Sequence, residues 1–199
     1  MSKKIWISLV AIILLVSFGG FFYWQKYIKE TPPEEWGEAN FASVSDFIVQ
    51  DISNKKVVEN KKVGLKIELP ENWTIKEPTF STDSFQALSP NSIEKNNMLM
   101  EKGCKLTINI INIRTDIETI QEEIQKNWGR FIETIMPIEK AGYKGIVYNV
   151  EPEKWKTSYK EIAIPIKGRV YSLILNSAIK VKQFCFEIFD EISDSFSVK

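Results

Sequence analysis

The fold class follows from one stretch of the chain, residues 162–175, which reads IAIPIKGRVYSLIL. Isoleucine occupies positions 162, 164 and 166, and this alternation is typical of a β-strand with one buried face. Lys167 and Gly168 then form a two-residue turn of the kind that needs a positive φ, and a second apolar strand follows. Strands joined by so short a turn are antiparallel, which excludes a doubly wound parallel sheet. Pro165 places the first strand at a sheet edge, or marks its end.

Further strands are predicted on the N-terminal side of this hairpin. Leu65, Ile67 and Leu69 alternate with charged residues, and their run ends at Pro70. The same alternation of apolar and polar residues recurs over residues 105–113 and 146–150, and the short run at residues 85–88 is a weaker strand candidate. The predicted strands cover residues 65–70, 85–88, 105–113 and 146–150.

Two helices are predicted among these strands. Thr115 and Glu118 match the S/T-x-x-E capping box at the start of a helix, and Gly129 stands where the helix would end. Between them an apolar stripe recurs at helical spacing, and we interpret Trp128 on this stripe as a packing residue. A last helix over residues 180–193 presents Phe184, Ile188 and Ile192 on its apolar face. One internal and one terminal helix with mainly antiparallel strands predict an α+β fold.

Particular residues in this order resemble a known superfamily over residues 63–199. Gly64 opens the run GLKIELP at residues 64–70, and Trp73 follows it. Tyr171 lies in the strand after the hairpin, and Ile192 with Ser195-Phe196 closes the last helix. Both ends of the pattern resemble the PsbP/Mog1-like superfamily. The resemblance implies an α/β/α sandwich built on a central, mainly antiparallel sheet.

The resemblance implies a binding or assembly role rather than one defined activity. In this superfamily PsbP supports the photosynthetic oxygen-evolving complex and Mog1 binds a small GTPase, while bacterial relatives include envelope proteins and secretion-associated chaperones. None of these is a well-established enzyme. Because one fold hosts several functions, the resemblance assigns no binding motif to a residue of this chain.

The N-terminus contains an apolar segment, residues 5–24, without one charged side chain. About 20 helical residues span the roughly 30 Å hydrocarbon core of a bilayer. The aromatic run Phe21-Phe22-Tyr23-Trp24 suits a membrane–water interface, so we interpret the segment as a retained anchor rather than a cleaved signal peptide or a core helix. The predicted domains are an anchor at residues 1–24, a linker at residues 25–62 that begins near Pro32 and Pro33, and a PsbP-like domain at residues 63–199.

Lysines flank the apolar segment on both sides. Lys3 and Lys4 precede it, and Lys26 and Lys29 follow it, so the positive-inside rule is nearly balanced. A short basic N-terminus before the first span usually stays in the cytoplasm. We therefore expect a single-pass protein of the cell membrane whose domain faces outward.

The composition argues against several classes of function. The chain of 199 residues has 26 basic and 26 acidic side chains, which gives none of the basic excess of a nucleic-acid-binding face. It contains no histidine, the commonest general base and metal ligand. Its two cysteines form no CxxC pair. We predict no catalytic residue, no metal site and no cofactor.

Two kinds of motif are interpreted as coincidental. Ser53 with Lys56, and Ser92 with Lys95, have the spacing of a Ser–Lys catalyst, but both pairs lie in polar stretches where a lysine would stay charged. Oxygen ligands for a hard cation occur at Glu151 and Glu153 and again in the last helix at Asp190, Glu191 and Asp194. We interpret both acidic groups as solvated surface.

Two cysteines and two tryptophans are the candidate site residues. Cys104 and Cys185 are interpreted as buried free thiols, because Cys185 shares a helix face with Ile188 and Ile192; a disulfide is the alternative. Trp36 and Trp155 are candidate contacts for a protein partner, since tryptophan is enriched at binding hot spots. Trp36 could instead lie at the membrane surface, and Trp155 could face the core.

The sequence therefore predicts a membrane-anchored, extracytoplasmic protein with a non-catalytic binding or assembly domain. Its membrane contact is residues 5–24, and its protein partner is unidentified. Two alternatives stay open, namely a passive structural component of the envelope and a secreted hydrolase released by signal cleavage.

Overall fold

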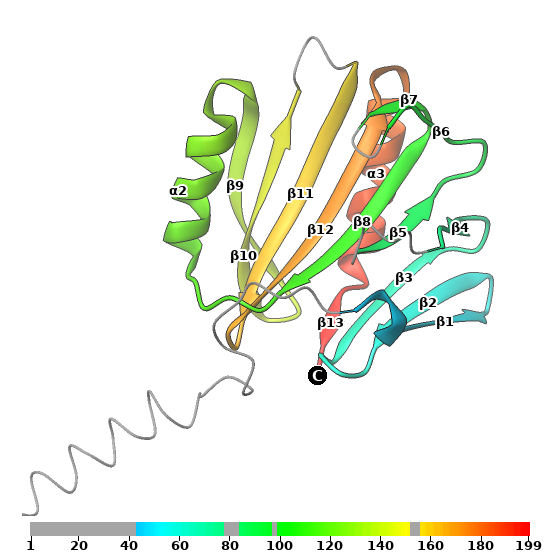
Figure 1. Cartoon of the computed structure of the whole chain (residues 1–199), viewed down its shortest axis with the longest axis horizontal. Coiled ribbons are helices and arrows are strands. Elements are labelled where there is room, and N and C mark those ends of the chain that lie inside the picture. Colours follow the sequence, from blue (N-terminus) through cyan, green and yellow to red (C-terminus); the bar gives the residue numbers. More distant parts are fainter. Residues whose placement is uncertain (1–42, 78–83, 97–98, 152–155) are drawn as a thin grey trace, which may run out of the picture. The chain divides into compact units, whose positions relative to one another are not determined.

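A seven-stranded sheet with the predicted hairpin near its centre forms the main part of the domain (Figure 1). The structure, a computed structural model, describes residues 43–77, 84–96, 99–151 and 156–199, which lie within one compact unit, Gly37–Lys199. Its helices are α2 (Ile117–Trp128) and α3 (Lys182–Asp194), with 3-10 turns η2 (Val44–Asp46), η3 (Gly129–Phe131) and η4 (Ile179–Val181). Its strands are β1 (Phe47–Ile52), β2 (Lys55–Asn60), β3 (Leu65–Pro70), β4 (Thr74–Ile75), β5 (Phe85–Leu88), β6 (Ile93–Glu94), β7 (Met100–Lys102), β8 (Cys104–Ile111), β9 (Ile132–Lys140), β10 (Tyr143–Val150), β11 (Thr157–Ile166), β12 (Arg169–Ala178) and β13 (Ser197–Val198).

The large sheet is antiparallel throughout, in the order β4-β5-β8-β12-β11-β10-β9. The β11–β12 hairpin pairs Thr157 with Ala178 at one end and Ile166 with Arg169 at the other. Lys167 and Gly168 both have positive φ, 46° and 78°, as a two-residue hairpin turn requires. The predicted hairpin is confirmed.

Pro165 lies at a strand end, one of the two predicted positions. β11 is an inner strand, but its pairing with β10 stops at Ala163. Pro165 is therefore beyond the residues that pair with β10, where its missing amide hydrogen costs no ladder hydrogen bond on that side.

A second sheet, β1-β2-β3-β13, corrects the predicted linker at residues 25–62. Residues 47–60 form a β1–β2 hairpin that pairs with β3, so the linker prediction was wrong for this part. The turn is made by Ser53 and Asn54, both at positive φ. The sequence concealed the hairpin because β1 is almost entirely exposed, and an exposed strand needs no apolar alternation.

The two helices pack on opposite faces of the large sheet. Ile162 and Ile164 of β11 belong to the larger core cluster, which also contains Phe189 of α3 and Ile67 of β3. Ala163, between those two isoleucines, belongs to a smaller cluster with the apolar face of α2. Because successive strand residues point to opposite faces, α3 and the small sheet cover one face and α2 covers the other. This layering agrees with a PsbP-like α+β fold.

Details of both helices differ from the predictions. Asp116, not Thr115, caps α2, because its carboxylate accepts a 2.8 Å hydrogen bond from the amide of Thr119. Phe184 was predicted to face the core but is 59% exposed, while Cys185, Phe186 and Phe189 are buried. The strand β9 was not predicted, since its residues are mostly exposed on the sheet edge.

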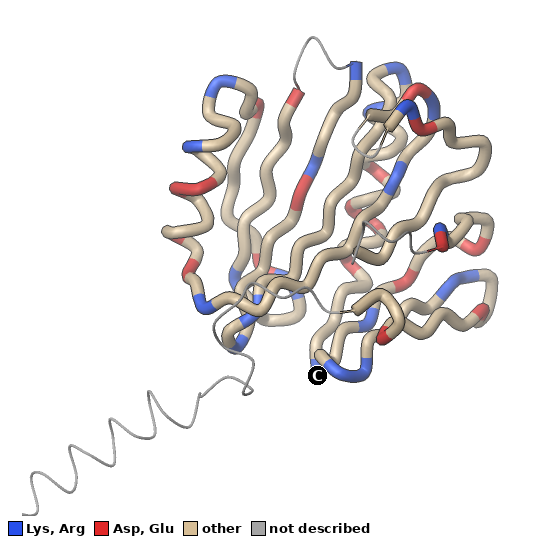
Figure 2. Tube along the Cα trace, viewed as in Figure 1, with Lys and Arg blue, Asp and Glu red and all other residues tan. Residues whose placement is uncertain are grey.

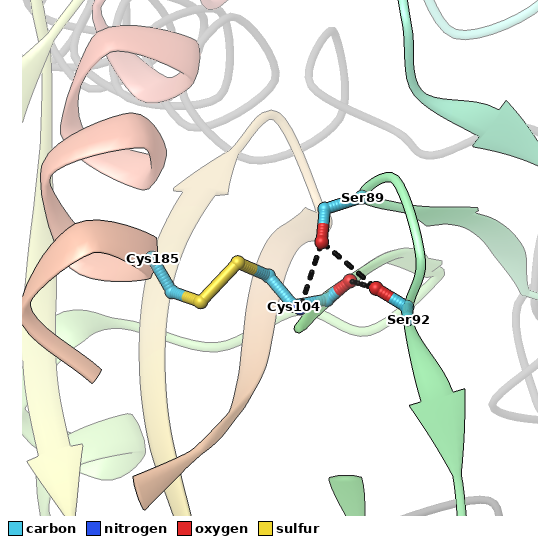
Figure 3. The surroundings of a disulfide bond; sticks show 4 residues. All are labelled: Ser89, Ser92, Cys104 and Cys185. Atoms are coloured by element: carbon cyan, nitrogen blue, oxygen red, sulfur yellow. Dashed lines mark hydrogen bonds between the residues drawn. A yellow bond between two sulfur atoms is a disulfide. The ribbon is translucent and has the colours of Figure 1, made fainter. Parts of the chain in front are cut away.

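Cys104 and Cys185 form a disulfide, so the preferred interpretation as free thiols was wrong. Figure 3 shows Cys185 of α3 bonded to Cys104 at the start of β8. The two Cα atoms lie 5.8 Å apart, within disulfide range, although 81 positions separate them in sequence. On the opposite side, the Ser89 hydroxyl accepts from the Cys104 amide at 3.0 Å, and the Ser92 hydroxyl donates to the Cys104 carbonyl at 3.2 Å.

The predicted membrane anchor, residues 5–24, lies outside the described residues. Within the part of the chain that the structure describes, no helix is long and apolar enough to cross a membrane.

Candidate functional site

A pocket of about 310 Å³ lies between α2 and the sheet face that it covers. This volume is at the lower end of the range for ligand pockets. α2 contributes one wall, and β10, β11 and β12 contribute the floor. The apolar lining residues are Ile111, Ile113, Ile120, Ile124, Trp128, Ala163 and Val170.

The floor of the pocket contains one carboxylate, Glu161 in the middle of β11. Its side chain accepts hydrogen bonds from three hydroxyls, those of Tyr148 at 2.5 Å, Ser172 at 2.5 Å and Tyr159. Tyr148 is the direct partner of Glu161 in the β10–β11 pairing, so the two side chains point to the same face. Strand register therefore assembles this group from residues on three neighbouring strands.

The electrostatics of the floor keep its two phenols neutral. Burial raises the pKa of Tyr148 far above its ordinary value, and the negative charge of Glu161 raises it further. The pKa of Tyr159 is raised for the same two reasons. Among the described residues, Glu161 takes part in no ion pair, and its negative charge is held by hydroxyl donors alone.

Trp128 at the end of α2 closes one side of the pocket. Its ring stacks on Tyr159 with the centroids 5.8 Å apart, and Tyr159 lies 5.8 Å from Tyr148. Trp128 also packs against the smaller core cluster, as the packing interpretation expected. The structure adds that this tryptophan lines the pocket.

The rim of the pocket is polar. Thr119, Glu123 and Asn127 are exposed on α2, and Arg114 and Thr115 precede that helix. An apolar wall with a polar rim and a few convergent polar groups on the floor is the usual composition of a small-ligand or side-chain pocket.

A second pocket, of about 390 Å³, lies beside the β2–β3 loop. Its lining is mainly charged, with Lys61, Lys62, Lys66, Arg169, Lys199 and Glu59. Figure 2 shows basic and acidic residues interspersed over the described chain. This pocket has few apolar lining residues, so we take the pocket under α2 as the candidate site.

Most residues singled out from the sequence lie elsewhere. Trp36 and Trp155 are outside the described residues. Lys56 pairs with Asp51 at 2.7 Å across the β1–β2 hairpin, with Ser53 in its turn. The Ser92 hydroxyl is bonded to Ser89 and to the main chain of Cys104. Neither Ser–Lys pair lies at the pocket.

Three of the five acidic residues considered as cation ligands are paired with lysines, and Glu153 lies outside the described residues. Glu151 pairs with Lys182, whose hydrogen bond is the main cause of a lowered pKa of the Glu151 carboxyl. Asp190 pairs with Lys160 at 2.5 Å, and Asp194 pairs with Lys140. In the described ranges no group of three or more His, Cys, Asp or Glu residues could hold a metal ion.

One further ionic cluster is buried away from the pocket. Lys105 of β8 is 1% exposed and pairs with Glu94 at 2.8 Å, and Lys76 pairs with the same carboxylate at 2.6 Å. Burial alone raises the pKa of Glu94, but the hydrogen bonds and charges of both lysines outweigh it and bring the pKa below its ordinary value. This cluster fixes the β6–β7 hairpin to the sheet.

Comparison with solved structures decides the fold. The chain matches cyanobacterial PsbP (CyanoP) from Synechocystis with a TM-score of 0.52 at 11% identity, over 82% of this chain and 99% of that one. The domain has the PsbP/Mog1-like fold. LpqN of Mycobacterium tuberculosis, described as involved in cell envelope biogenesis, aligns at 9% identity over 68% of this chain and 83% of its own, with a TM-score of 0.46. No protein-family model and no curated protein matches the sequence.

The residues behind the resemblance have structural roles in the PsbP-like domain. Trp73 is 2% exposed in the larger core. The Tyr171 hydroxyl donates to the Val63 carbonyl at 2.7 Å, and its ring meets Phe196 edge-on at 6.0 Å. The Ser195 hydroxyl accepts from the Glu68 amide at 2.8 Å. These contacts join β3, β12 and the C-terminal segment on the sheet face opposite to the pocket.

The polar group on the pocket floor was not predicted as a site from the sequence. Tyr148 was assigned only to strand alternation, and Glu161 lies just before the apolar run at residues 162–166. The available signal was the polar groups Tyr159, Glu161 and Ser172 on the second face of strands whose first face is apolar. These residues can be recognised as one site only when the register of β10, β11 and β12 is known, because the register places them next to one another.

Proposed function

We propose that this protein is a membrane-tethered, non-catalytic binding protein whose PsbP-like domain holds a partner at the pocket under α2. The observation that carries the proposal is the pocket itself, with apolar walls, a polar rim and one carboxylate on its floor. Such a composition suits the capture of a side chain or a small ligand.

A tether and an outward-facing domain are supported by two independent features. The apolar segment at residues 5–24 is long enough to span a bilayer. The disulfide between Cys104 and Cys185 suits an oxidising compartment, since disulfides are rare where thiols are kept reduced. The first feature supports the tether, and the second favours the extracytoplasmic side of the membrane.

A binding role rather than catalysis is supported by the chemistry of the floor. Glu161 already accepts three hydrogen bonds, and the raised pKa values of Tyr148 and Tyr159 make these phenols poor bases and nucleophiles. An activated nucleophile needs a lowered pKa or a neighbouring base.

The proposal is tested by site-specific crosslinking of the full chain in its own membranes. A photo-crosslinker replaces Asn127 on the rim, and the matched control replaces Glu187 on the exposed face of α3. We expect a stoichiometric crosslinked partner from position 127 only. Thr119→Trp, which places a large ring at the rim of the pocket, should abolish that crosslink.

Two results would overturn the binding role. Equal crosslinking from positions 127 and 187, or crosslinking that Thr119→Trp leaves unchanged, would place the partner elsewhere. Crosslinks to other copies of this chain alone would support a structural envelope component instead.

The tether is tested separately by peptide mass spectrometry of the mature protein in the membrane fraction. We expect peptides from residues 5–24 to be present and the protein to resist extraction at alkaline pH. Loss of these residues, with release of the domain, would show a cleaved signal peptide.

A further inference from the structure

We propose that the pocket under α2 binds an alkylammonium group, with the ammonium at Glu161 and the alkyl stem along the apolar wall. This inference rests on the proposed binding function and names the chemistry that the same site recognises. A lysine side chain and a free aliphatic amine share this chemistry.

The charge on the floor favours a cation. Glu161 is half-buried and open to the pocket, and within the described residues no basic group pairs with it. At the rim, Arg114 and Glu123 carry opposite charges that offset each other, so the net charge of the pocket lining is the negative charge of Glu161. Burying a carboxylate without a counter-ion costs free energy, and a bound cation recovers part of that cost.

The hydrogen-bonding capacity of the floor also fits an ammonium group. A carboxylate offers about four lone-pair positions, and three hydroxyl donors leave Glu161 with about one more. The Ser172 hydroxyl donates to Glu161, so its own oxygen can still accept. Asn109 does not itself line the pocket, but it is the β8 partner of the lining residue Ser172, and its buried carbonyl oxygen has no hydrogen-bond partner in the described chain.

These acceptors lie on one face because cross-strand partners point the same way. An ammonium group brings three donors and no acceptor, whereas a carboxylate ligand would bring only acceptors to a floor of acceptors. The ring of Tyr148 lines the same floor and can add a cation–π contact.

The wall accounts for the alkyl stem. Ile120 and Ile124 of α2 and Val170 of β12 line the pocket, and all three are buried core residues. An alkyl stem whose ammonium group is at Glu161 has these apolar side chains beside it. Each methylene group that the wall removes from water strengthens binding, so the stem adds affinity without adding charge.

The test compares three four-carbon probes of similar size on the full chain in neutral detergent micelles. Butylammonium, butanol and butyrate are titrated while methyl signals of Ala163 and Ile120 are followed by NMR. We expect butylammonium to bind at least about tenfold more tightly than butanol, and butyrate not to bind. Glu161→Gln should bring the two affinities within about twofold, while Glu139→Gln on the exposed edge strand β9 should change neither.

The orientation of the bound probe gives a readout that does not depend on a variant. Intermolecular NOEs should join the methylene next to the nitrogen to Tyr148, and the terminal methyl to Ile120. The reverse orientation, or an equal preference for butanol in the wild type, would overturn the inference even if Glu161→Gln failed to fold.

Two further comparisons complete the test. The first identifies whether the ammonium group belongs to a protein or to a small molecule, and the second distinguishes failure of this inference from failure of the proposed function. A blocked Gly-Lys-Gly peptide that competes with butylammonium, where its Nε-acetyl form does not, assigns the site to a lysine of a protein partner; binding of the free amine alone assigns it to a small molecule. If butanol binds as well as butylammonium and Thr119→Trp blocks both, the ammonium inference is wrong while the pocket remains the binding site.

Discussion

At the scale of single residues, Gly64 shows why the pattern shared with the PsbP/Mog1-like fold begins with glycine. Its φ is +74°, and a Cβ built there would lie 2.5 Å from the carbonyl oxygen of Lys199. The Lys199 amide in turn donates to the Gly64 carbonyl at 3.1 Å. Glycine therefore lets β13 close against β3, and a side chain at this position would separate the two strands.

Gly142 provides a matched control for a prediction at Gly64. Its φ is +80°, but an added Cβ would meet nothing within 4 Å. We expect Gly142→Ala to lower the free energy of unfolding by about 1 kcal/mol, the cost of a left-handed alanine. Gly64→Ala should lower it by about 3 kcal/mol, because steric overlap is added. Denaturant unfolding measures both, and equal losses would contradict the close approach of Lys199.

At the scale of elements, α2 illustrates a helix whose existence was predicted and whose start was misplaced by one residue. Thr115 and Glu118 match a capping box, but the carboxylate of Asp116 accepts the Thr119 amide. That hydrogen bond lowers the pKa of Asp116 below its ordinary value. Both residues are good N-caps, so the sequence alone did not choose between them.

The cap makes a prediction with a defined pH dependence. Asp116→Ala should lower the melting temperature at neutral pH, whereas Thr115→Ala should change it little. Because the folded-state pKa of Asp116 is lowered, its stabilisation is present above the ordinary carboxyl pKa and is lost as the pH falls through the lowered value. The two variants should therefore converge at low pH in thermal melts. A larger effect of Thr115→Ala at neutral pH would show that the capping box was correct.

At the scale of the whole molecule, the disulfide joins the C-terminal helix α3 to the sheet strand β8. Sequence spacing could not reveal the bond, because helical periodicity equally supports a buried thiol at position 185. The cross-link closes a loop of 81 positions. Loop closure of this length restricts the unfolded chain strongly.

Removal of the disulfide is predicted to cost substantial stability. Cys104→Ala with Cys185→Ala should lower the free energy of unfolding by about 4 kcal/mol, the chain-entropy value for such a loop. Denaturant unfolding with and without reductant measures the effect, and the double variant should not respond to reductant. Alkylation of both cysteines in the unreduced wild type would show free thiols and contradict the bond.

The strands that alternate cleanly were predicted, and the exposed strands were not. The strand β3 was predicted from the alternation of Leu65, Ile67 and Leu69, because one of its faces is buried and the other is half-exposed. β1 and β9 are largely exposed. Neither strand has a buried face that would require an apolar residue at every second position, so their sequences show no such alternation. The same reason explains the wrong linker boundary at residue 62.

Local patterns in the sequence by themselves determined the antiparallel hairpin, the two helices, the apolar segment at residues 5–24 and the resemblance to the PsbP/Mog1-like fold. The hairpin, the helices and the apolar segment each depend on residues within about 20 positions of one another, where periodicity and turn chemistry act directly. The resemblance depends on the order of such local patterns along residues 63–199. Only the tertiary structure decided the disulfide, the small sheet and the pocket at Glu161. These depend on strand register and helix packing between distant segments, which no local pattern specifies.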